Sequence, residues 1–561
     1  MKRFRWQLII IFLTGIIVGV LLLGEQSVET NVVEPEPIRG GIYSEALIGS
    51  LLRLNPILDA YNSVDRDVDR LIFSGLLRID DRGLPQPDLA ESWGISQDGT
   101  IFNLTLRQDL TWHDGAPVTT EDVLFTIELL REGSEIIPED LYNFWQEIEV
   151  IALSEDTLQF RLPEAFSPFP DYLTFGILPA HLLANLTFDE IIDDPFNLNP
   201  VGSGPYQFDR LIVETDQITG IVLSVFDDYY GEKPFIEQIV FRYYPDGFAA
   251  LQAYRDGIVQ GIGMISDDIL ENVLQEPALN LYTGRMPEQT LIFLNLNNPE
   301  VAFFQEPSIR KALLQGINRQ WIIDKLLNGQ GIIANGVILP NTWAHYDGLE
   351  PIPYDLDAAK LAIKEAGYLV SSETGTVREK DGLIFQFELL YPDDDVHQAL
   401  AESIQNDWKQ LDIEIDLVPL PYDEIVNGRL QARSFEAALV NLDLSKTPDP
   451  DPYPFWDQAQ ATGGQNYSQW DNRVASEYLE QARVTTDLLE RERLYRNFQV
   501  VFYNEMPSLP IYFTIYNYAV DQSVQGVRVG PIFDSSDRFA TISDWFLISR
   551  KPESPGEPES E

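Results

Sequence analysis

One short segment holds the residues most suited to chemistry. From Leu110 to Val123 the chain reads LTWHDGAPVTTEDV, with His113 beside Asp114, and such a pair can serve as a general base or a metal site. No serine in a nucleophile elbow accompanies it, and none of the four histidines stands at zinc-ligand spacing. The Asp-Gly pair is typical of a tight turn, and Thr119 stands three residues before Asp122, as in a capping box. We therefore interpret the segment as a turn and a helix start.

The composition limits the possible partners. The 561 residues include 89 acidic and 38 basic side chains, which give a formal net charge of -51. Repulsion at this charge excludes nucleic acid and anionic membrane surfaces as partners. The charge is typical of a heavily solvated surface, and it also favours cationic ligands. Cysteine is absent, which excludes disulfides, thiolate metal sites, cysteine nucleophiles and a lipid-modified cysteine.

The N-terminus has the pattern of an export signal. Lys2, Arg3 and Arg5 precede an uncharged apolar run from Leu8 to Gly24, which indicates a hydrophobic helix with its start in the cytoplasm. Because no A-x-A cleavage pattern follows, we predict an uncleaved signal anchor over 1–24 rather than a cleaved signal peptide. The protein would then lie outside the cytoplasmic membrane, anchored by this helix. We further predict a linker over 25–37 and a disordered tail over 550–561.

Between linker and tail, short strands alternate with helices. Alternating apolar and polar residues predict half-buried strands, and apolar residues at helical spacing predict amphipathic helices. Asp357 is the expected N-cap of one of these helices. The mixture predicts an α/β protein with helix-covered sheets. The strands are expected at 101–107, 157–163, 220–226, 236–244 and 413–420, and the helices at 307–329, 355–368, 397–411, 472–486 and 488–505.

Several segments, in order, resemble the family-5 extracellular solute-binding proteins, the oligopeptide-, dipeptide- and nickel-binding components of ABC importers. The resemblance covers the chain from about Gly40 to Leu547. Gly316 and Asn318 depart from it, because the family often has Ala and Asp there. The matching segments read RLIFSGLLRIDDRGLPQPDLAESWGISQDGT, FNLTLRQDLTWHDGAPVTTEDVLFTIELL, GSGPYQF, PSIRKALLQGINRQWI, DLDAAKLAIKEAGY and GGQNYSQWDNRVASEYLEQAR.

The resemblance implies a two-lobed, periplasmic-binding-protein-like (type II) α/β fold with a hinge. Lobe one would be discontinuous, formed by 38–285 and 507–549 and enlarged by an inserted subdomain at about 70–200. Lobe two would span 286–506. The chain would cross the hinge near GRMPEQTLIFLNLNN and again near EMPSLPIYF. The ligand would lie between the lobes, with no cofactor, no metal and no covalent chemistry, so we expect a monomeric binding protein that is not an enzyme.

The candidate ligand-binding residues follow from the same resemblance. Asp443 ends the expected strand FEAALVNLDL and would receive the α-ammonium group of a peptide. The nearby aromatic residues would line a pocket or belong to the core, and these two interpretations are balanced. Asp449 and Asp451 lie in a proline-rich turn that lacks the glycine and glutamate of a calcium loop, and we interpret them as structural. The full set is Asp443, Asn441, Tyr453, Phe455, Trp456, Gly49, Ser50 and Asn295.

Three functional classes stay open. The first is a solute-binding protein that captures short peptides and delivers them to an ABC permease and ATPase, with oligosaccharides as the alternative ligand and nickel third. The second is a ligand sensor on the same fold, which signals without transport. The third is an extracellular hydrolase with paired carboxylates, which is the weakest because no acid pair stands out in the sequence.

Overall fold

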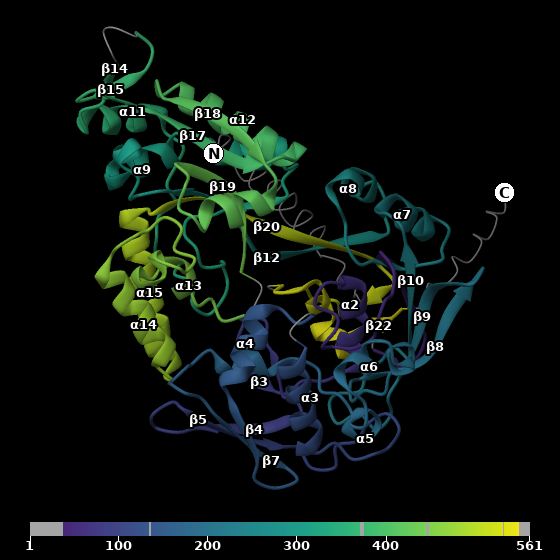
Figure 1. Ribbon diagram of the computed structural model, residues 1–561. Coiled ribbons are helices and arrows are strands. Elements are labelled where there is room, and N and C mark those ends of the chain that lie inside the picture. The colour runs from purple at the N-terminus through teal and green to yellow at the C-terminus, as the bar shows by residue number, and fades with distance from the viewer. Residues whose placement is uncertain (1–36, 134–135, 371–374, 445–447, 531, 549–561) are drawn as a thin grey trace, which may run out of the picture. The chain divides into compact units, whose positions relative to one another are not determined.

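The computed structural model describes residues 37–133, 136–370, 375–444, 448–530 and 532–548 (Figure 1). The predicted anchor, all but the last residue of the predicted linker and the predicted tail lie outside these ranges. Within the ranges, no helix has both the length and the apolar character that a membrane crossing requires. The arrangement of strands and helices confirms the predicted α/β fold class with two lobes.

One eleven-stranded sheet extends through both lobes. Its strands are β1 (Ile42–Ile48), β8 (Tyr206–Glu214), β9 (Gln217–Val225), β10 (Gln238–Tyr244), β11 (Gly261–Ile262), β12 (Leu279–Leu294), β13 (Gly331–Ile333), β17 (Gln386–Pro392), β18 (Glu414–Leu420), β19 (Ala437–Asp443) and β20 (Ser508–Asp521). The order is β18-β17-β19-β12-β20-β11-β1-β10-β9-β8, and β13 pairs with β20 off this path. β17 is parallel to β18 and β19, and β1 is parallel to β10 and β11.

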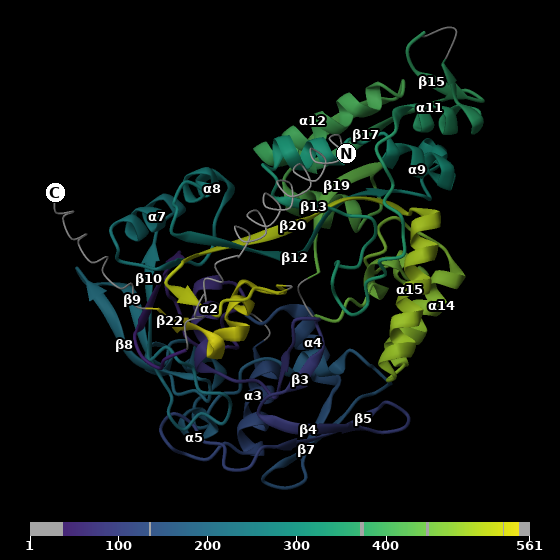
Figure 2. The same cartoon turned by 180° about the vertical axis from the view of Figure 1, so that it is seen from behind.

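β12 and β20 connect two separate hydrophobic cores. The first core draws its residues from 43–241 and 516–545, and the second from 291–512. The two strands run antiparallel and side by side in both ribbon views (Figures 1 and 2). Their pairing shifts register between Arg285 and Gln289 and between Thr290 and Leu291. Tyr282 packs against the first core and Leu291 belongs to the second, so the strands pass from one core to the other at these irregularities.

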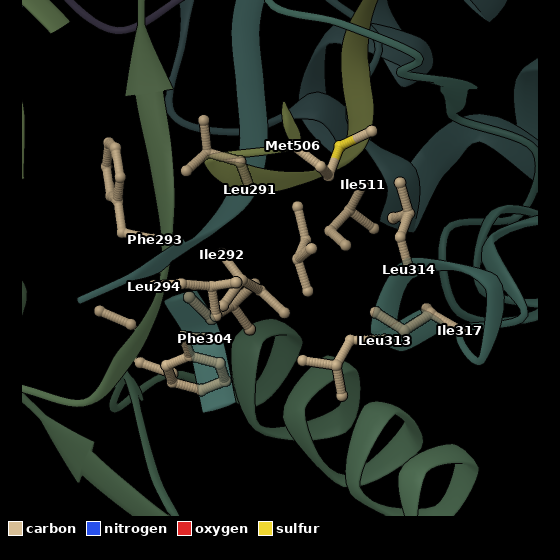
Figure 3. Packing of buried hydrophobic residues seen from close by; sticks show 14 of the residues in the cluster. Leu291, Ile292, Phe293, Leu294, Phe304, Leu313, Leu314, Ile317, Met506 and Ile511 are labelled. Carbon is tan, nitrogen blue, oxygen red and sulfur yellow. The ribbon is translucent and has the colours of Figure 1, made fainter. Parts of the chain in front are cut away.

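The second core is built around the apolar end of β12. Leu291, Ile292, Phe293 and Leu294 are buried there with Ile511 of β20 (Figure 3). Each fully buried leucine contributes about 1.5–3 kcal/mol of transfer free energy. The helices of this lobe are α9 (Pro307–Gln315), α10 (Arg319–Trp321), α11 (Leu356–Glu365), α12 (Asp395–Lys409), α13 (Tyr453–Trp456), α14 (Arg473–Val484) and α15 (Leu488–Glu505), with the helical turns Pro299–Gln305, Ile322–Leu326, Glu424–Leu430 and Gln458–Ala461.

Two sequence predictions in this lobe are wrong in detail. The helix predicted over 307–329 is interrupted, because α9 ends at Gln315 and Asn318 caps a new start. The N-cap of α11 is Asp355, not Asp357, because the carboxylate of Asp355 accepts a hydrogen bond from the backbone N–H of Ala358 at 2.9 Å. Asp357 lies in the first turn, where a negative charge still favours the helix.

A four-stranded antiparallel sheet in the order β4-β5-β7-β6 contributes side chains to the first core. Its strands are β4 (Ala90–Ile95), β5 (Ile101–Leu106), β6 (Glu149–Ala152) and β7 (Thr157–Arg161). The helices of this lobe are α2 (Ser63–Ile72), α3 (Thr120–Glu132), α4 (Glu139–Glu147), α5 (Ala180–Leu183), α6 (Phe188–Ile192), α7 (Gly247–Arg255) and α8 (Asp267–Val273), with the helical turns Phe169–Leu173, Pro195–Leu198 and Ser535–Asp544.

Three small sheets complete the fold. They pair β2 (Leu77–Ile79) with β3 (Pro85–Pro87), join β14 (Leu369–Val370), β15 (Arg378–Lys380) and β16 (Leu383–Ile384), and pair β21 (Val524–Gln525) with β22 (Phe546–Leu547).

Candidate ligand-binding site

The histidine that opened the sequence analysis has a structural role. The ring of His113 accepts a hydrogen bond from the backbone N–H of Gly202 at 3.1 Å, and its other nitrogen lies 3.0 Å from the carbonyl oxygen of Gly204. Burial lowers the pKa of His113 to about 4, so the ring is neutral at pH 7. Thr119 and Asp122 form the predicted capping box at the start of α3. The segment is a turn and a helix start that hold the glycine-rich segment 202–204.

A cavity of about 560 Å³ lies at the point where β12 and β20 leave the second core, and we name it the hinge cavity. Met286, Pro287 and Glu288 of β12 line it together with the end of β19. Residues of the first lobe and Tyr516 of β20 form the other side. Its volume lies within the range of about 300–1,000 Å³ that is usual for small-ligand pockets.

Two carboxylates on neighbouring strands line the hinge cavity. Glu288 of β12 lies directly opposite Asp443 of β19 in the antiparallel register. Burial raises the pKa of Glu288, and the charge of Asp443 raises it further. Like charges placed directly opposite each other destabilise a sheet. A positive group bound in the cavity would therefore favour the charged form of Glu288.

Asn441 orients the Glu288 carboxylate. Its side-chain amide donates to Glu288 at 3.0 Å and its side-chain oxygen accepts from the hydroxyl of Thr290 at 2.8 Å. The hydroxyl of Tyr422, another residue of the cavity, donates to the Asn441 carbonyl at 2.7 Å. These bonds fix the Glu288 carboxylate from two neighbouring strands, which leaves little conformational freedom to lose when a ligand binds.

The opposite wall carries an ion pair and two hydroxyls. The guanidinium of Arg66 lies 2.6 Å from the carboxylate of Asp534. Ser63, the first residue of α2, and Ser535 line the same wall. Since the described lining contains Glu288, Asp443 and Asp534 against Arg66, acidic residues predominate in the hinge cavity.

A buried ion network positions this wall. Arg538 is fully buried and donates to Glu45 at 2.6 Å and to Asp67 at 2.8 Å. The hydroxyl of Ser535 also donates to Asp67, at 3.0 Å. We name Arg538, Glu45, Asp67 and Ser535 the Arg538 network. It ties β1 and α2 to the segment that carries Asp534, so the wall is held by charge-assisted bonds.

The predicted aromatic residues lie elsewhere. Trp456 is buried in the second core, with its ring 5.8 Å from that of Phe293. Tyr453 and Phe455 pack against the same core, and the guanidinium of Arg483 lies 4.3 Å from the ring centre of Tyr453. None of the three belongs to the described lining of the hinge cavity. This placement favours the core interpretation of these aromatics.

Asn295 lies at the far end of the strand pair from Asp443. It directly follows the last residue of β12 and stands seven positions after Glu288, a span of about 24 Å at roughly 3.4 Å per residue. Its side chain is buried, and its amide donates to the carbonyl oxygens of Arg433 and Phe435 at 3.1 and 2.9 Å. These bonds give Asn295 a part in holding the turn before β19.

Gly49 and Ser50 are exposed and lie beside the start of α2. Gly49 has φ +129°, and a Cβ there would meet Val64 at 3.0 Å. The carbonyl of Ser50 accepts a hydrogen bond from the side chain of Asn62, the N-cap of α2, at 3.1 Å. The two residues thus support the helix end that presents Ser63 to the hinge cavity.

The proline-rich turn is held by ion pairs, as a structural role requires. Asp449 is buried and lies 2.6 Å from the guanidinium of Arg491. Asp451 lies 3.2 Å from Arg483. Within the described ranges no three histidine or acidic side chains are arranged to hold a metal ion.

Sequence reasoning missed Glu288, Arg66 and Asp534. Glu288 could have been found, because it is an acid placed just before the buried run TLIFL of a hinge strand. Arg66 and Asp534 lie at opposite ends of the chain. No spacing in the sequence connects these two residues, and only the fold brings them to one wall.

The hinge cavity lies at the strands that two cores share, which is where a two-lobed solute-binding protein would hold its ligand. The comparisons agree. The family model "Bacterial extracellular solute-binding proteins, family 5 Middle" matches residues 85–465. The chain therefore belongs to the family-5 extracellular solute-binding proteins, which serve ABC importers.

Individual relatives cover most of the chain. The dipeptide-binding protein of Escherichia coli (strain K12) is 25% identical over 80% of this chain and 84% of its own length. The oligopeptide-binding protein AppA of Bacillus subtilis (strain 168) is 23% identical over 91% of this chain and 92% of its own. Among solved structures, HbpA2 of Haemophilus parasuis has a TM-score of 0.78 at 20% identity, covering 91% of this chain and 100% of that one, which shows the fold.

Proposed function

We propose that the protein captures short peptides in the hinge cavity and delivers them to the permease of an ABC importer. The α-ammonium group of the peptide binds between Glu288 and Asp443. The observation that carries the proposal is the placement of these two carboxylates opposite each other on the cavity wall. Peptide-binding relatives support the choice of ligand class.

The remaining polar groups of the hinge cavity suit a peptide main chain. Ser63, Ser535 and Tyr422 offer hydroxyl groups, and the Arg66–Asp534 pair offers a cation and an acceptor. Such groups bind peptide N–H and C=O groups without selecting a side chain, and bridging waters can adapt them to different sequences. Binding needs no covalent step, so the proposed role is that of a binding protein and not of an enzyme.

We further propose that β12 and β20 are the hinge, with lobe boundaries near Arg285 and Met506. The register shifts in β12 support this, because an irregular ladder bends more readily than a regular one. Small-angle scattering is expected to show a smaller radius of gyration with saturating peptide than without. An unchanged radius would contradict closure of the lobes.

The N-terminal membrane anchor belongs to the same proposal. Its support is the apolar run Leu8–Gly24 without a cleavage pattern. Mass analysis of the mature protein is expected to find these residues still attached. A mature chain that begins near Gln26 or later would contradict the anchor.

The decisive experiment compares free and N-acetylated tripeptides by calorimetry. Acetylation removes the positive charge, and Asp443→Asn removes half of its receptor. Asp443 is exposed in this structure, and the proposed closure of the lobes on a peptide would bury it. Since truncating one partner of a buried charged pair costs about 2–5 kcal/mol, each change alone should weaken trialanine binding by at least about tenfold. Acetylation should have a much smaller effect on binding to the variant than on binding to the wild type. Asp357→Asn, which removes an exposed charge on α11, is the matched control and should bind as the wild type does. Equal affinity for free and acetylated peptides, or binding of oligosaccharides alone, would refute the proposal.

A further inference from the structure

A second cavity of about 370 Å³ adjoins the hinge cavity, and we name it the acidic cavity. Arg66, Phe533 and Asp534 line both cavities, so the Arg66–Asp534 ion pair separates them. Five carboxylates line the acidic cavity, from Asp59, Asp69, Asp171, Asp534 and Asp537, against the two guanidinium groups of Arg66 and Arg70. The cavity therefore holds more carboxyl groups than guanidinium groups next to the proposed peptide site.

Three of these carboxylates have bonding partners in the fold. Asp534 pairs with Arg66 at 2.6 Å. Asp537 accepts from the backbone N–H groups of Phe533 and Asp534, each at 3.0 Å. Asp171 accepts from the backbone N–H of Asp449 at 2.5 Å. These bonds give each of the three a structural role.

Asp69 is different. Its side chain is buried, with 2% of the residue exposed, and neither oxygen accepts a hydrogen bond of ordinary geometry from any described group. The backbone N–H of Asn55 faces it and favours the charged form, but burial and the charges of Asp59 and Asp65 raise its pKa well above the usual value. A buried carboxylate without a partner costs free energy, which a ligand cation could recover.

Asp59 lies on the same cavity and shares this environment. Burial raises the pKa of Asp59 to about 8, even though Arg66 opposes the shift. The hydroxyl of Tyr243, which is buried near Asp65 and Asp69, also lacks a described partner. The region around Asp59 and Asp69 thus combines several under-satisfied polar groups, and strongly perturbed acids of this kind mark functional sites.

The lining also contains apolar and aromatic side chains. Phe73, Ile79, Leu141 and Phe175 belong to it. A long aliphatic stem that ends in a positive group fits such a pocket, because the stem packs on the apolar wall while the charge meets the carboxylates. A bare metal ion fits less well, since no three acidic or histidine side chains in the described ranges are arranged as ligands.

We propose that the acidic cavity is a specificity pocket for a cationic side chain, lysine or arginine, of the bound peptide, with Asp69 and Asp59 as its receptors. This inference rests on the proposed function, because it takes the peptide main chain to lie in the adjoining hinge cavity. The protein would then select basic peptides from a mixture, while neutral peptides bind more weakly.

The first test compares peptides that differ in one charge. Trialanine is replaced at each of its three positions by lysine or by norleucine, which has a similar stem and no charge. At one position or more, the lysine peptide should bind at least about tenfold more tightly than its norleucine partner, as a charge-assisted contact in a dry pocket predicts. Equal affinities at all three positions would overturn the inference, and the proposed function would stand.

The second test locates the preference. Asp69→Asn and Asp59→Asn should each reduce the lysine preference to less than about threefold and leave the norleucine peptides bound as before. Asp357→Asn should keep the full preference. Retention of the preference in both cavity variants would overturn the assignment of the receptors. Asn has the same shape as Asp and removes a charge that is costly to bury, so both variants should fold. Circular dichroism of each variant checks this.

A third arm separates the two proposals. n-Butylguanidine carries the cation and stem without a peptide, and it should bind the wild type weakly and the Asp69→Asn variant more weakly still. If it does so while no peptide binds, the acidic cavity stands as a cation site and the peptide function fails. If it binds both proteins equally, the cavity assignment fails.

Discussion

Asp67 and Asp69 lie two residues apart on α2, and their surroundings are opposite. Asp67 receives two hydrogen bonds from Arg538, at 2.8 and 2.9 Å, and one from Ser535. Asp69 receives none of ordinary geometry. Both residues are buried, with 6% and 2% of their surface exposed. The same residue type on the same helix is therefore a structural ion in one case and an under-satisfied acid beside a cavity in the other.

The third aspartate of the helix completes the comparison. Asp65 accepts from the backbone N–H groups of Leu52 and Arg53 at 2.8 and 2.9 Å. Asp65 and Asp69 are four residues apart and share a helix face, whereas Asp67 does not share it. Burial alone thus does not identify a functional acid. The informative feature is a buried acid whose partners are missing within the described fold.

The largest expected effect comes from breaking the Arg538 network. Arg538→Met would leave Glu45 and Asp67 buried without their cation, and removing one partner of a buried ion pair costs about 3–5 kcal/mol. Urea unfolding should show this loss in the free energy of unfolding. Arg493→Met, at an exposed pair with Glu490, is the control and should change little. A small loss at Arg538 would mean that the network is not what makes Asp67 structural.

A smaller loss is expected at Asp67 itself. Asp67→Asn keeps the shape but removes the charge that Arg538 binds, and hydrogen bonds to charged groups contribute about 1.5–3 kcal/mol. The free energy of unfolding should fall by a similar amount. Because Ser535 would also lose a strong acceptor, peptide affinity should fall modestly as the cavity wall loosens. An unchanged free energy of unfolding would contradict the structural role of Asp67 that distinguishes it from Asp69.

The acidic cavity predicts a pH dependence of ligand choice. Asp59 has a pKa of about 8 and faces Arg66, Asp65, Asp69 and Asp534. A lysine side chain binds its charged form, so binding releases a proton below that pKa. The affinity ratio of lysine to norleucine peptides should rise with pH between 6 and 8, by up to about tenfold per pH unit for one coupled proton. Calorimetry in buffers of different ionisation enthalpy measures the released proton. A ratio that stays constant would contradict the coupling.

The smallest effect is on the stability of the free protein. The folded-state pKa of Asp69 is raised above its unfolded value, so ionisation opposes folding and the wild type loses stability as pH rises toward the folded pKa. Asp69→Asn removes this loss. The difference in free energy of unfolding between the variant and the wild type should grow in the variant's favour from pH 6 to pH 9, as long as the pH stays below the folded pKa. A variant less stable than the wild type at both pH values would show that Asp69 has a structural partner.

Local elements were the most predictable part of the structure. The capping box of Thr119 and Asp122, the strand at 101–106 and the helix at 488–505 depend on neighbouring residues, and each is confirmed. The interruption of the helix after Gln315 was not predicted, because the apolar spacing continues through the interruption. A new helix begins after Asn318, which is its N-cap. Asp443 was predicted from its place at a strand end, and it lies on the hinge cavity. Its role in binding remains a proposal.

The sequence by itself determined the family, the acidic character and the order of the main elements, because these depend on motifs, composition and local periodicity. It did not determine which acids have partners. Asp67 forms an ion pair with Arg538, which is 471 residues away in the sequence. Glu288 lies opposite Asp443 because of the register between their two strands. Only the tertiary structure decides such pairings, because the interaction between two charges depends on their distance in space. The number of residues between them in the sequence does not predict that distance.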